Sequence, residues 1–369
     1  MDLQAQFRRA EQLAREGSFS EASVVLEGVL TVAGEHPQAL LMLANIRAHC
    51  GDLDSAFEYF DRCEAIAPDR SIVAFHRARA FVHSGDLDRA VEQFELAIAE
   101  NPTVPEYQQT LGGVLLRAGE LDKALQVFSS AIKLNPGHAP AHSDRALVLK
   151  RLGRLQEALD GFESAIRLNP QFAPAHANLS ELYIELGRTT DSVVCARQAV
   201  ALAPSQPQSH LQLGIALKAA EDTDGALQAY RRALELDPDH YQARINLGNV
   251  HRDNGNWGDA RAAYERASQI QPASAQATAS YAATFLVQDE LAEAAAVCDR
   301  FLAAYPQNGL VMACRTVIGV ALGEDSWSAD PAALLGISHP RPPNGYQTID
   351  AFNEALSQYV ESHPSLSFA

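Results

Sequence analysis

The sequence predicts an all-α solenoid of about nine helix–turn–helix repeats of 34 residues each, followed by a capping helix and a short tail. The first observation is a run of prolines at seven consecutive intervals of 34 residues: Pro68, Pro102, Pro136, Pro170, Pro204, Pro238, Pro272 and Pro306. The second is a pair of apolar stripes at helical spacing within each interval. Self-similarity at this period indicates a repeat architecture, in which neighbouring units stack to bury a continuous core.

The proline register divides residues 1–308 into nine consecutive units: 3–36, 37–70, 71–104, 105–138, 139–172, 173–206, 207–240, 241–274 and 275–308. In unit 105–138, Leu115 lies on the apolar face of a first helix and Phe128 lies on that of a second. Gly119 separates the two helices, since a glycine at a helix C-terminus readily takes the left-handed conformation. Pro136 ends the second helix, because proline cannot continue a helix interior.

Small and aromatic residues recur at fixed positions of the unit. Position 20 is Ala22, Ala56, Ala90, Ala124, Ala158, Ala226, Ala260 and Ala294, with Ser192 as the exception. The second helix carries an aromatic residue at Phe60, Phe94, Phe128, Phe162, Tyr230 and Tyr264. This pattern predicts close helix packing, in which a residue larger than alanine at position 20 overpacks the core at a cost of about 1–3 kcal/mol.

Together the leucine–glycine pair, the aromatic residue, the alanines and the closing proline resemble the tetratricopeptide repeat over residues 3–308. Two units depart from the pattern, with Ala196 and Cys298 where the aromatic residue is expected, and the tryptophan common at position 4 is absent. The resemblance implies a right-handed superhelical stack with a groove lined chiefly by the first helix of each unit. It also implies a non-catalytic scaffold that binds a peptide or protein segment and needs no cofactor.

Positions 2, 5, 6, 9, 12 and 13 of the first helix are expected to face this groove, because positions 4, 7, 8 and 11 form the core stripe. The candidate binding residues are Asn45, Arg79, Arg117, Lys150, Arg151, Asn178, Gln212, Lys218, Asn246, Asn249 and Arg252. An asparagine amide donates and accepts hydrogen bonds at once, which suits the backbone of an extended ligand. Asn178 and Asn246 share position 6, which is similar to an incomplete form of the asparagine ladder of the O-linked N-acetylglucosamine transferases. The lysine-and-asparagine clamp of chaperone-binding repeats is absent, so we expect no chaperone docking.

Four of the basic groove residues, Lys150, Arg151, Lys218 and Arg252, stand out in a chain with 29 basic and 46 acidic residues and a net charge of −17. Two interpretations remain open. In the first, these residues anchor an acidic ligand segment that is steered into the groove. In the second, they are solvated residues paired with nearby Asp and Glu side chains.

Three histidines repeat at position 4, namely His142, His176 and His210, which raises the question of a metal site. Equivalent helices in a stack lie roughly 8–10 Å apart, whereas a single ion needs its nitrogen ligands at about 2.0–2.1 Å. We therefore expect interface histidines that take the place of the tryptophan, and no metal.

The acidic composition argues against nucleic acids as partners, because their phosphates are repelled, and against anionic membranes. No stretch approaches the roughly 18 continuous apolar residues that a membrane-spanning helix needs, and the N-terminus is typical of an amphipathic helix rather than a signal peptide. Five cysteines without CxxC spacing predict reduced thiols and a cytoplasmic chain. The sequence does not predict an oligomeric state.

After Pro306 the period ends. We expect a capping helix and linker over residues 309–335, and a tail over 336–369 with a helix near 348–361. The tail resembles the lead-in to a 2-oxoglutarate/Fe(II) oxygenase domain that follows repeat arrays in some bacterial proteins, on the pairs Gly345-Tyr346, Phe352-Asn353 and His363-Pro364. The iron ligands of that family would lie beyond Ala369. The resemblance therefore implies an alternative function, the substrate-recognition arm of such an oxygenase.

Overall fold

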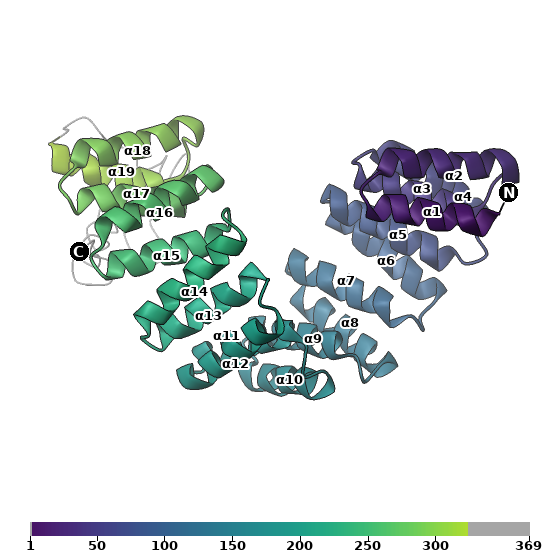
Figure 1. Cartoon of the computed structure of the whole chain (residues 1–369), viewed down its shortest axis with the longest axis horizontal. Helices are drawn as coiled ribbons and strands as arrows, with labels where there is room; N and C mark the ends of the chain where they lie inside the picture. Colours follow the sequence, from purple (N-terminus) through teal and green to yellow (C-terminus); the bar gives the residue numbers. More distant parts are fainter. Residues whose placement is uncertain (1, 324–369) are drawn as a thin grey trace, which may run out of the picture. The chain divides into compact units, whose positions relative to one another are not determined.

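The computed structural model describes residues 2–323, and every regular element in that range is an α-helix (Figure 1). The all-α fold class is therefore confirmed. In chain order the helices are α1 (Leu3–Arg15), α2 (Phe19–Ala33), α3 (Pro37–His49), α4 (Leu53–Ile66), α5 (Arg70–Ser84), α6 (Leu87–Glu100), α7 (Pro105–Ala118), α8 (Leu121–Leu134), α9 (Ala139–Arg151), α10 (Leu155–Leu168), α11 (Ala173–Glu185), α12 (Thr189–Leu202), α13 (Pro207–Ala219), α14 (Thr223–Leu236), α15 (Tyr241–Asp253), α16 (Trp257–Ile270), α17 (Ala275–Leu286), α18 (Leu291–Ala304) and α19 (Gly309–Leu322). The odd-numbered helices from α1 to α17 are the first helices of the repeats, and the even-numbered ones are the second helices.

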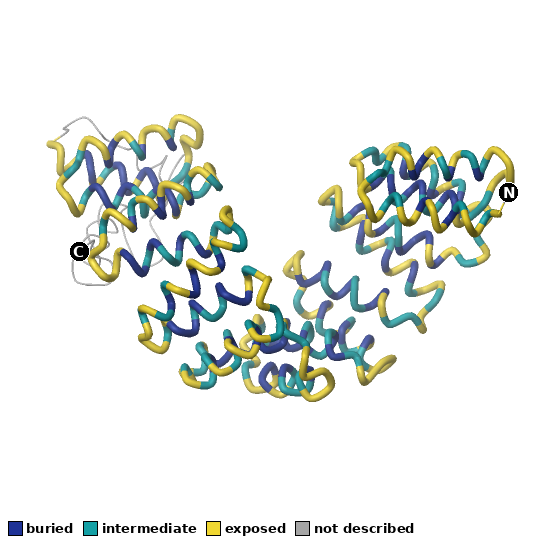
Figure 2. The backbone as a smooth tube through the Cα atoms, in the orientation of Figure 1, coloured by how far each residue is buried: buried dark blue, intermediate teal, exposed yellow. Residues whose placement is uncertain are grey.

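The chain forms two compact units, an N-terminal unit (Met1–Leu182) and a C-terminal unit (Tyr183–Ala369), which divide within α11. From α1 to α10 each first helix packs against its own second helix, and from α2 to α8 that second helix packs against the next first helix. The C-terminal unit keeps the same order from α12 to α19. In Figure 2 the buried residues accordingly follow the helix faces that meet other helices, and the exposed residues follow the outward faces and the turns.

Aspartate caps and turn glycines set the ends of several helices. Asp86 precedes α6, and its side chain accepts a hydrogen bond from the backbone N–H of Arg89. Asp52 and Asp222 act in the same way at α4 and α14. These bonds satisfy amide groups that the first turn of a helix leaves free. At the other end of a helix, Gly119 has a φ of 82° and ends α7 in the left-handed conformation that the sequence predicts.

Six helix pairs carry an aromatic side chain at the core position of the second helix, and each of these side chains is at most 1% exposed: Phe60, Phe94, Phe128, Phe162, Tyr230 and Tyr264. Glycines on the first helix make room for three of these rings. A Cβ atom built on Gly112 would lie 2.7 Å from the ring of Phe128, and one built on Gly248 would lie 2.7 Å from the ring of Tyr264. In these helix pairs the core therefore depends on a glycine of the first helix facing a large ring of the second helix.

A polar side chain occupies position 4 in five consecutive repeats and bonds to the carbonyl of the proline six residues earlier. The donors are Gln108, His142, His176, His210 and Arg244, and the acceptors are Pro102, Pro136, Pro170, Pro204 and Pro238. A carbonyl oxygen can only accept, so Nε2 of each histidine carries the proton. The three periodic histidines therefore tie each first helix to the turn before it, which agrees with the structural role expected from their spacing.

The last described helix, α19, packs against α17 and α18 and buries Val311, Cys314 and Ile318. On its outer face Leu310 is 54% exposed and Val320 is 76% exposed. Among the described residues, no helix combines the length and the apolar character that crossing a membrane requires. The helix expected near 348–361 and the segment that resembles an oxygenase lead-in lie outside the described residues.

Candidate functional site

A groove of about 510 Å³ lies on the N-terminal unit, and its walls come from three successive first helices. Helix α5 contributes Arg79 and His83, α7 contributes Gln109, Gly113 and Arg117, and α9 contributes Asp144. Gly113 has no side chain to fill the groove, and a Cβ atom built there would meet nothing within 4 Å. Helices α5, α7 and α9 thus share one hollow surface of the kind that can bind an extended ligand.

Arg79 and Arg117 are the two predicted binding residues that line this groove. Both side chains are exposed. Neither guanidinium has a hydrogen bond or an ion pair with any other residue in the range 2–323. Ten donor N–H groups, five on each guanidinium, are therefore available to water or to a ligand.

Asp144 brings a carboxylate into the same groove. Gln109 Nε2 donates to Asp144 Oδ2 over 3.4 Å, and within the described part of the chain no cation pairs with this carboxylate. Burial raises the pKa of Asp144, while the hydrogen bond from Gln109 and the nearby His138 partly oppose that rise. The carboxylate of Asp144 is therefore less favourably placed as an anion than a solvated one.

Other predicted groove residues of the N-terminal unit are engaged within the chain. Lys150 Nζ lies 2.8 Å from Glu181 Oε1, and the lysine side chain is only 9% exposed. Arg151 Nη1 donates to the backbone carbonyl of Leu116 over 3.3 Å. Lys150 is thus paired with an acid, as in the second interpretation, although it is largely buried, whereas Arg151 bonds to a backbone carbonyl and not to an Asp or Glu side chain.

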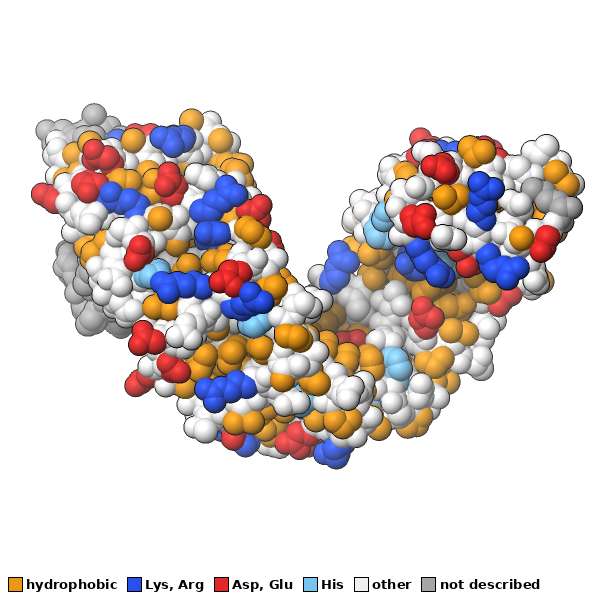
Figure 3. All heavy atoms as spheres, viewed as in Figure 1, with side chains coloured by type: hydrophobic (Ala, Val, Ile, Leu, Met, Phe, Trp, Pro, Cys, Tyr) orange, Lys and Arg blue, Asp and Glu red, His pale blue; other side chains and the backbone are white. Residues whose placement is uncertain are grey.

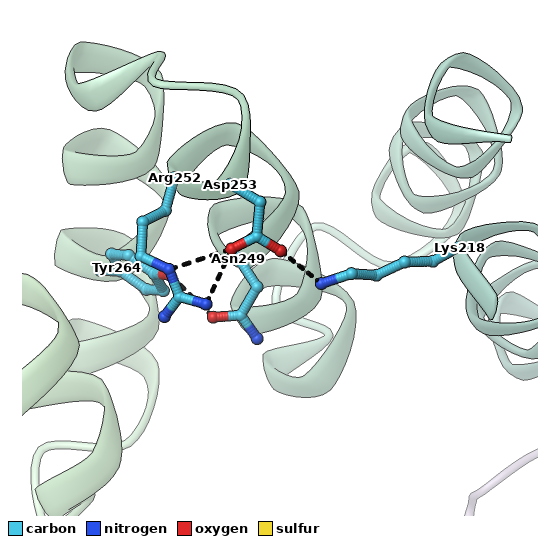
Figure 4. Close-up of polar contacts among 5 residues, drawn as sticks. All are labelled: Lys218, Asn249, Arg252, Asp253 and Tyr264. Atoms are coloured by element: carbon cyan, nitrogen blue, oxygen red, sulfur yellow. Dashed lines mark hydrogen bonds and ion pairs between the residues drawn. The ribbon is translucent and has the colours of Figure 1, made fainter. Parts of the chain in front are cut away.

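In the C-terminal unit, Asp253 gathers two of the predicted cations (Figure 4). Lys218 Nζ lies 2.8 Å from Asp253 Oδ2, and Arg252 Nη2 lies 2.9 Å from Asp253 Oδ1. Burial alone would raise the pKa of Asp253, but the hydrogen bonds from Lys218 and Arg252 hold it below its usual range. Neither cation of this cluster is left without an acidic partner.

The asparagine and glutamine side chains among the predicted binding residues differ in whether they form hydrogen bonds within the chain. Asn249 Oδ1 accepts from Tyr264 Oη over 2.7 Å (Figure 4), and Asn246 Oδ1 accepts from Gln242 Nε2 over 3.2 Å. Asn45 and Asn178, by contrast, have no side-chain hydrogen bond within residues 2–323. Gln212 keeps a buried Oε1 atom without a partner.

The expectation that position 5 faces the groove is wrong for five first helices. Position 5 is buried where it is occupied by Phe7, Phe75, Ser143, Leu211 and Ile245. The position lies at the border of the core stripe, so a small shift in helix packing decides whether it is covered. Gln109 is a position-5 residue that does line the groove.

Gln109, Thr110 and Asp144 line the groove but were not among the predicted binding residues. A signal for all three is present, because Gln109 is at position 5 and Thr110 and Asp144 share position 6 with Asn178 and Asn246. Both positions are expected to face the groove. In Figure 3 acidic, basic and apolar side chains are interspersed on the face shown, so charge type alone does not mark the groove.

Residues 3–244 match the family model described as the cilia and flagella-associated protein 70 C-terminal domain, and residues 245–309 match a tetratricopeptide repeat model. The fold is similar to that of a tetratricopeptide repeat protein from Parabacteroides merdae ATCC 43184, at 19% identity and a TM-score of 0.52 over 67% of this chain and 98% of the other. It is also similar to a chain of the APC/C hetero-tetramer Cut9-Hcn1, at 14% identity and a TM-score of 0.55 over 84% of this chain and 75% of the other. No protein of curated function matches the chain.

Proposed function

The chain belongs to the tetratricopeptide-repeat family, and from that premise we propose that it is a protein–protein interaction module whose first helices hold a peptide or protein segment. Repeat stacks of this kind present extended surfaces rather than closed catalytic pockets. We assign residues 2–323 no catalytic role and no cofactor.

The observation that carries the proposal is the groove of about 510 Å³ shared by α5, α7 and α9. A segment lying across several first helices would meet a side chain from each of them in turn. Arg79, Arg117 and Gln109 offer donors there, and Asp144 offers an acceptor. Such a surface suits an extended backbone, which presents one donor and one acceptor on most residues.

The acidic ligand expected from Lys150, Lys218 and Arg252 is not part of this proposal. These three residues form ion pairs with Glu181 or Asp253. A ligand carboxylate would have to displace an existing partner at each of them, so they add little net attraction.

The alternative function, the substrate-recognition arm of an oxygenase, rests on a tail segment outside the described residues. It requires the same peptide-binding face and is compatible with the proposal. We further propose a reducing compartment such as the cytoplasm, because all five cysteines are free thiols, three of them buried.

The test is a selection of peptides from a phage-displayed random library on the full chain. The affinity of a selected peptide is then measured by fluorescence anisotropy for the Asn178→Ala/Asn246→Ala variant. We expect weaker binding with an unchanged thermal midpoint, because both amides are only half-buried and belong to first helices.

The matched control is Gln126→Ala/Gln228→Ala, which removes one exposed amide from a second helix of each unit. This control should bind the peptide as the unchanged chain does. Equal losses of affinity in both variants, or a loss of thermal stability in the asparagine variant, would assign a structural role to Asn178 and Asn246. Failure to select any peptide would contradict the proposed function.

A further inference from the structure

We propose that the groove of the N-terminal unit recognises an acidic segment of a partner protein, with Arg79 and Arg117 binding its Asp or Glu carboxylates. This inference rests on the proposed function and adds the chemical class of the ligand. It assigns the charge recognition to two arginines rather than to Lys150, Arg151, Lys218 and Arg252. The reason is how each cation is engaged within the chain.

Three polar contacts between consecutive first helices share one spacing, in which the two residues lie 35 positions apart. The three examples are Gln109 with Asp144, Leu116 with Arg151, and Lys218 with Asp253. Because the repeat is 34 residues long, each contact joins position n of one repeat to position n + 1 of the next repeat. A partner 35 residues away is thus one way in which a groove residue is engaged within the chain, whereas Lys150 pairs with Glu181, 31 residues away.

For Arg79 and Arg117 this spacing leads to apolar residues. Val114 lies 35 positions after Arg79, and Val82 lies 35 positions before Arg117. Both valines line the same groove as the two arginines. The valine side chains offer no acceptor, and neither guanidinium is paired within the described residues. The same apolar surface suits the methylene groups of a ligand's glutamate side chains.

The absence of an acidic partner is notable in a chain with 46 acidic and 29 basic residues. It does not by itself define a site, because Arg9 and Arg70 are also exposed and also lack a partner in the range 2–323. The distinction is that Arg79 and Arg117 share one hollow of about 510 Å³, whereas Arg9 and Arg70 do not line it. A bound acidic segment can reach both groove arginines at once, and charge-assisted bonds to guanidinium groups are among the stronger polar contacts.

Two carboxylates belong to the groove and oppose an acidic ligand. Glu106 is exposed at the start of α7, where water screens its charge. Within residues 2–323, the carboxylate of Asp144 accepts a hydrogen bond from the amide of Gln109 alone, and burial raises the pKa of Asp144. Replacing Asp144 with asparagine removes the opposing charge without changing the shape of the side chain, which gives a variant expected to bind an acidic ligand more tightly.

The experiment measures binding of a fluorescein-labelled oligo-glutamate peptide, with an oligo-lysine peptide as comparison, by anisotropy at low and high salt. We expect oligo-glutamate to bind, with an affinity that falls as salt rises. The Arg79→Gln/Arg117→Gln variant should bind about tenfold more weakly, the loss expected for one to two bonds to charged groups. The Asp144→Asn variant should bind more tightly.

The control variant is Arg9→Gln/Arg70→Gln, which removes the same charge from the same unit outside the groove. It should change the affinity by no more than about twofold, as for exposed charges in general. Equal weakening in both double variants would contradict the inference and indicate an unspecific charge effect. If library-selected peptides bind but oligo-glutamate does not, the inference fails while the proposed function stands. If a phosphoserine peptide binds and oligo-glutamate does not, the ligand is a phosphate and the inference is again wrong.

Discussion

At the scale of single residues, the packing of the helices depends on which positions are glycine. Gly112 and Gly113 are neighbours in α7, yet their surroundings are opposite. A Cβ atom on Gly112 would lie 2.7 Å from the fully buried ring of Phe128, whereas one on Gly113 would meet nothing within 4 Å. The sequence predicts close packing at position 8, which Gly112 occupies, because the leucine–glycine pair recurs there. It also predicts that position 9, which Gly113 occupies, faces the groove, and the space around Gly113 is open.

Substitution of these two neighbouring glycines by alanine is expected to change the free energy of unfolding in opposite directions. We expect Gly112→Ala to destabilise the chain by about 1–2 kcal/mol, since the methyl group forces the Phe128 ring out of its position. We expect Gly113→Ala to stabilise it by about 0.4–1 kcal/mol, because alanine favours the helix and restricts the unfolded chain. Urea denaturation of both variants checks the prediction. Destabilisation of similar size in both would mean that the crowding at Gly112 is not what limits substitution.

At the scale of elements, the sequence predicts where helices begin and end better than how they are tied to the turns. The prolines and turn glycines mark helix ends directly, because proline ends a helix and glycine takes a positive φ. The hydrogen bonds from position 4 to the proline carbonyls, by contrast, cannot be predicted from residue type. Gln108, His210 and Arg244 have little in common as residue types, and their shared role is visible only once the helix brings each donor back over the preceding turn.

A substitution at His210 tests this tie between helix and turn. His210 Nε2 donates to the carbonyl of Pro204 over 2.9 Å, and the side chain is buried. We expect His210→Leu to lower the free energy of unfolding by about 1 kcal/mol, the usual net worth of such a bond. His210→Gln should retain most of the stability, because Gln108 makes the equivalent bond to Pro102. Thermal unfolding of the two variants at one pH distinguishes them, and equal stability would show that the bond contributes nothing.

At the scale of the whole chain, each of the two units is a series of helices packed on their neighbours in sequence. The 34-residue period predicts such an architecture well, because each repeat packs against its neighbours through the same positions. It predicts the binding face less well. Arg79 and Arg117, at positions 9 and 13 of their repeats, line the groove. Lys150, Lys218 and Arg252 share position 12 of their repeats, and each of them pairs with an acid on a first helix.

The central claim is that the first helices form the binding face. It is tested most directly by giving a library-selected peptide a benzophenone side chain, cross-linking it to the full chain with light, and identifying the modified residues by mass spectrometry. We predict cross-links on the first helices, among them residues of α7 such as Gln109, Gly113 and Arg117. Cross-links confined to exposed residues of the second helices, such as Val24 in α2 or Val194 in α12, would contradict the account.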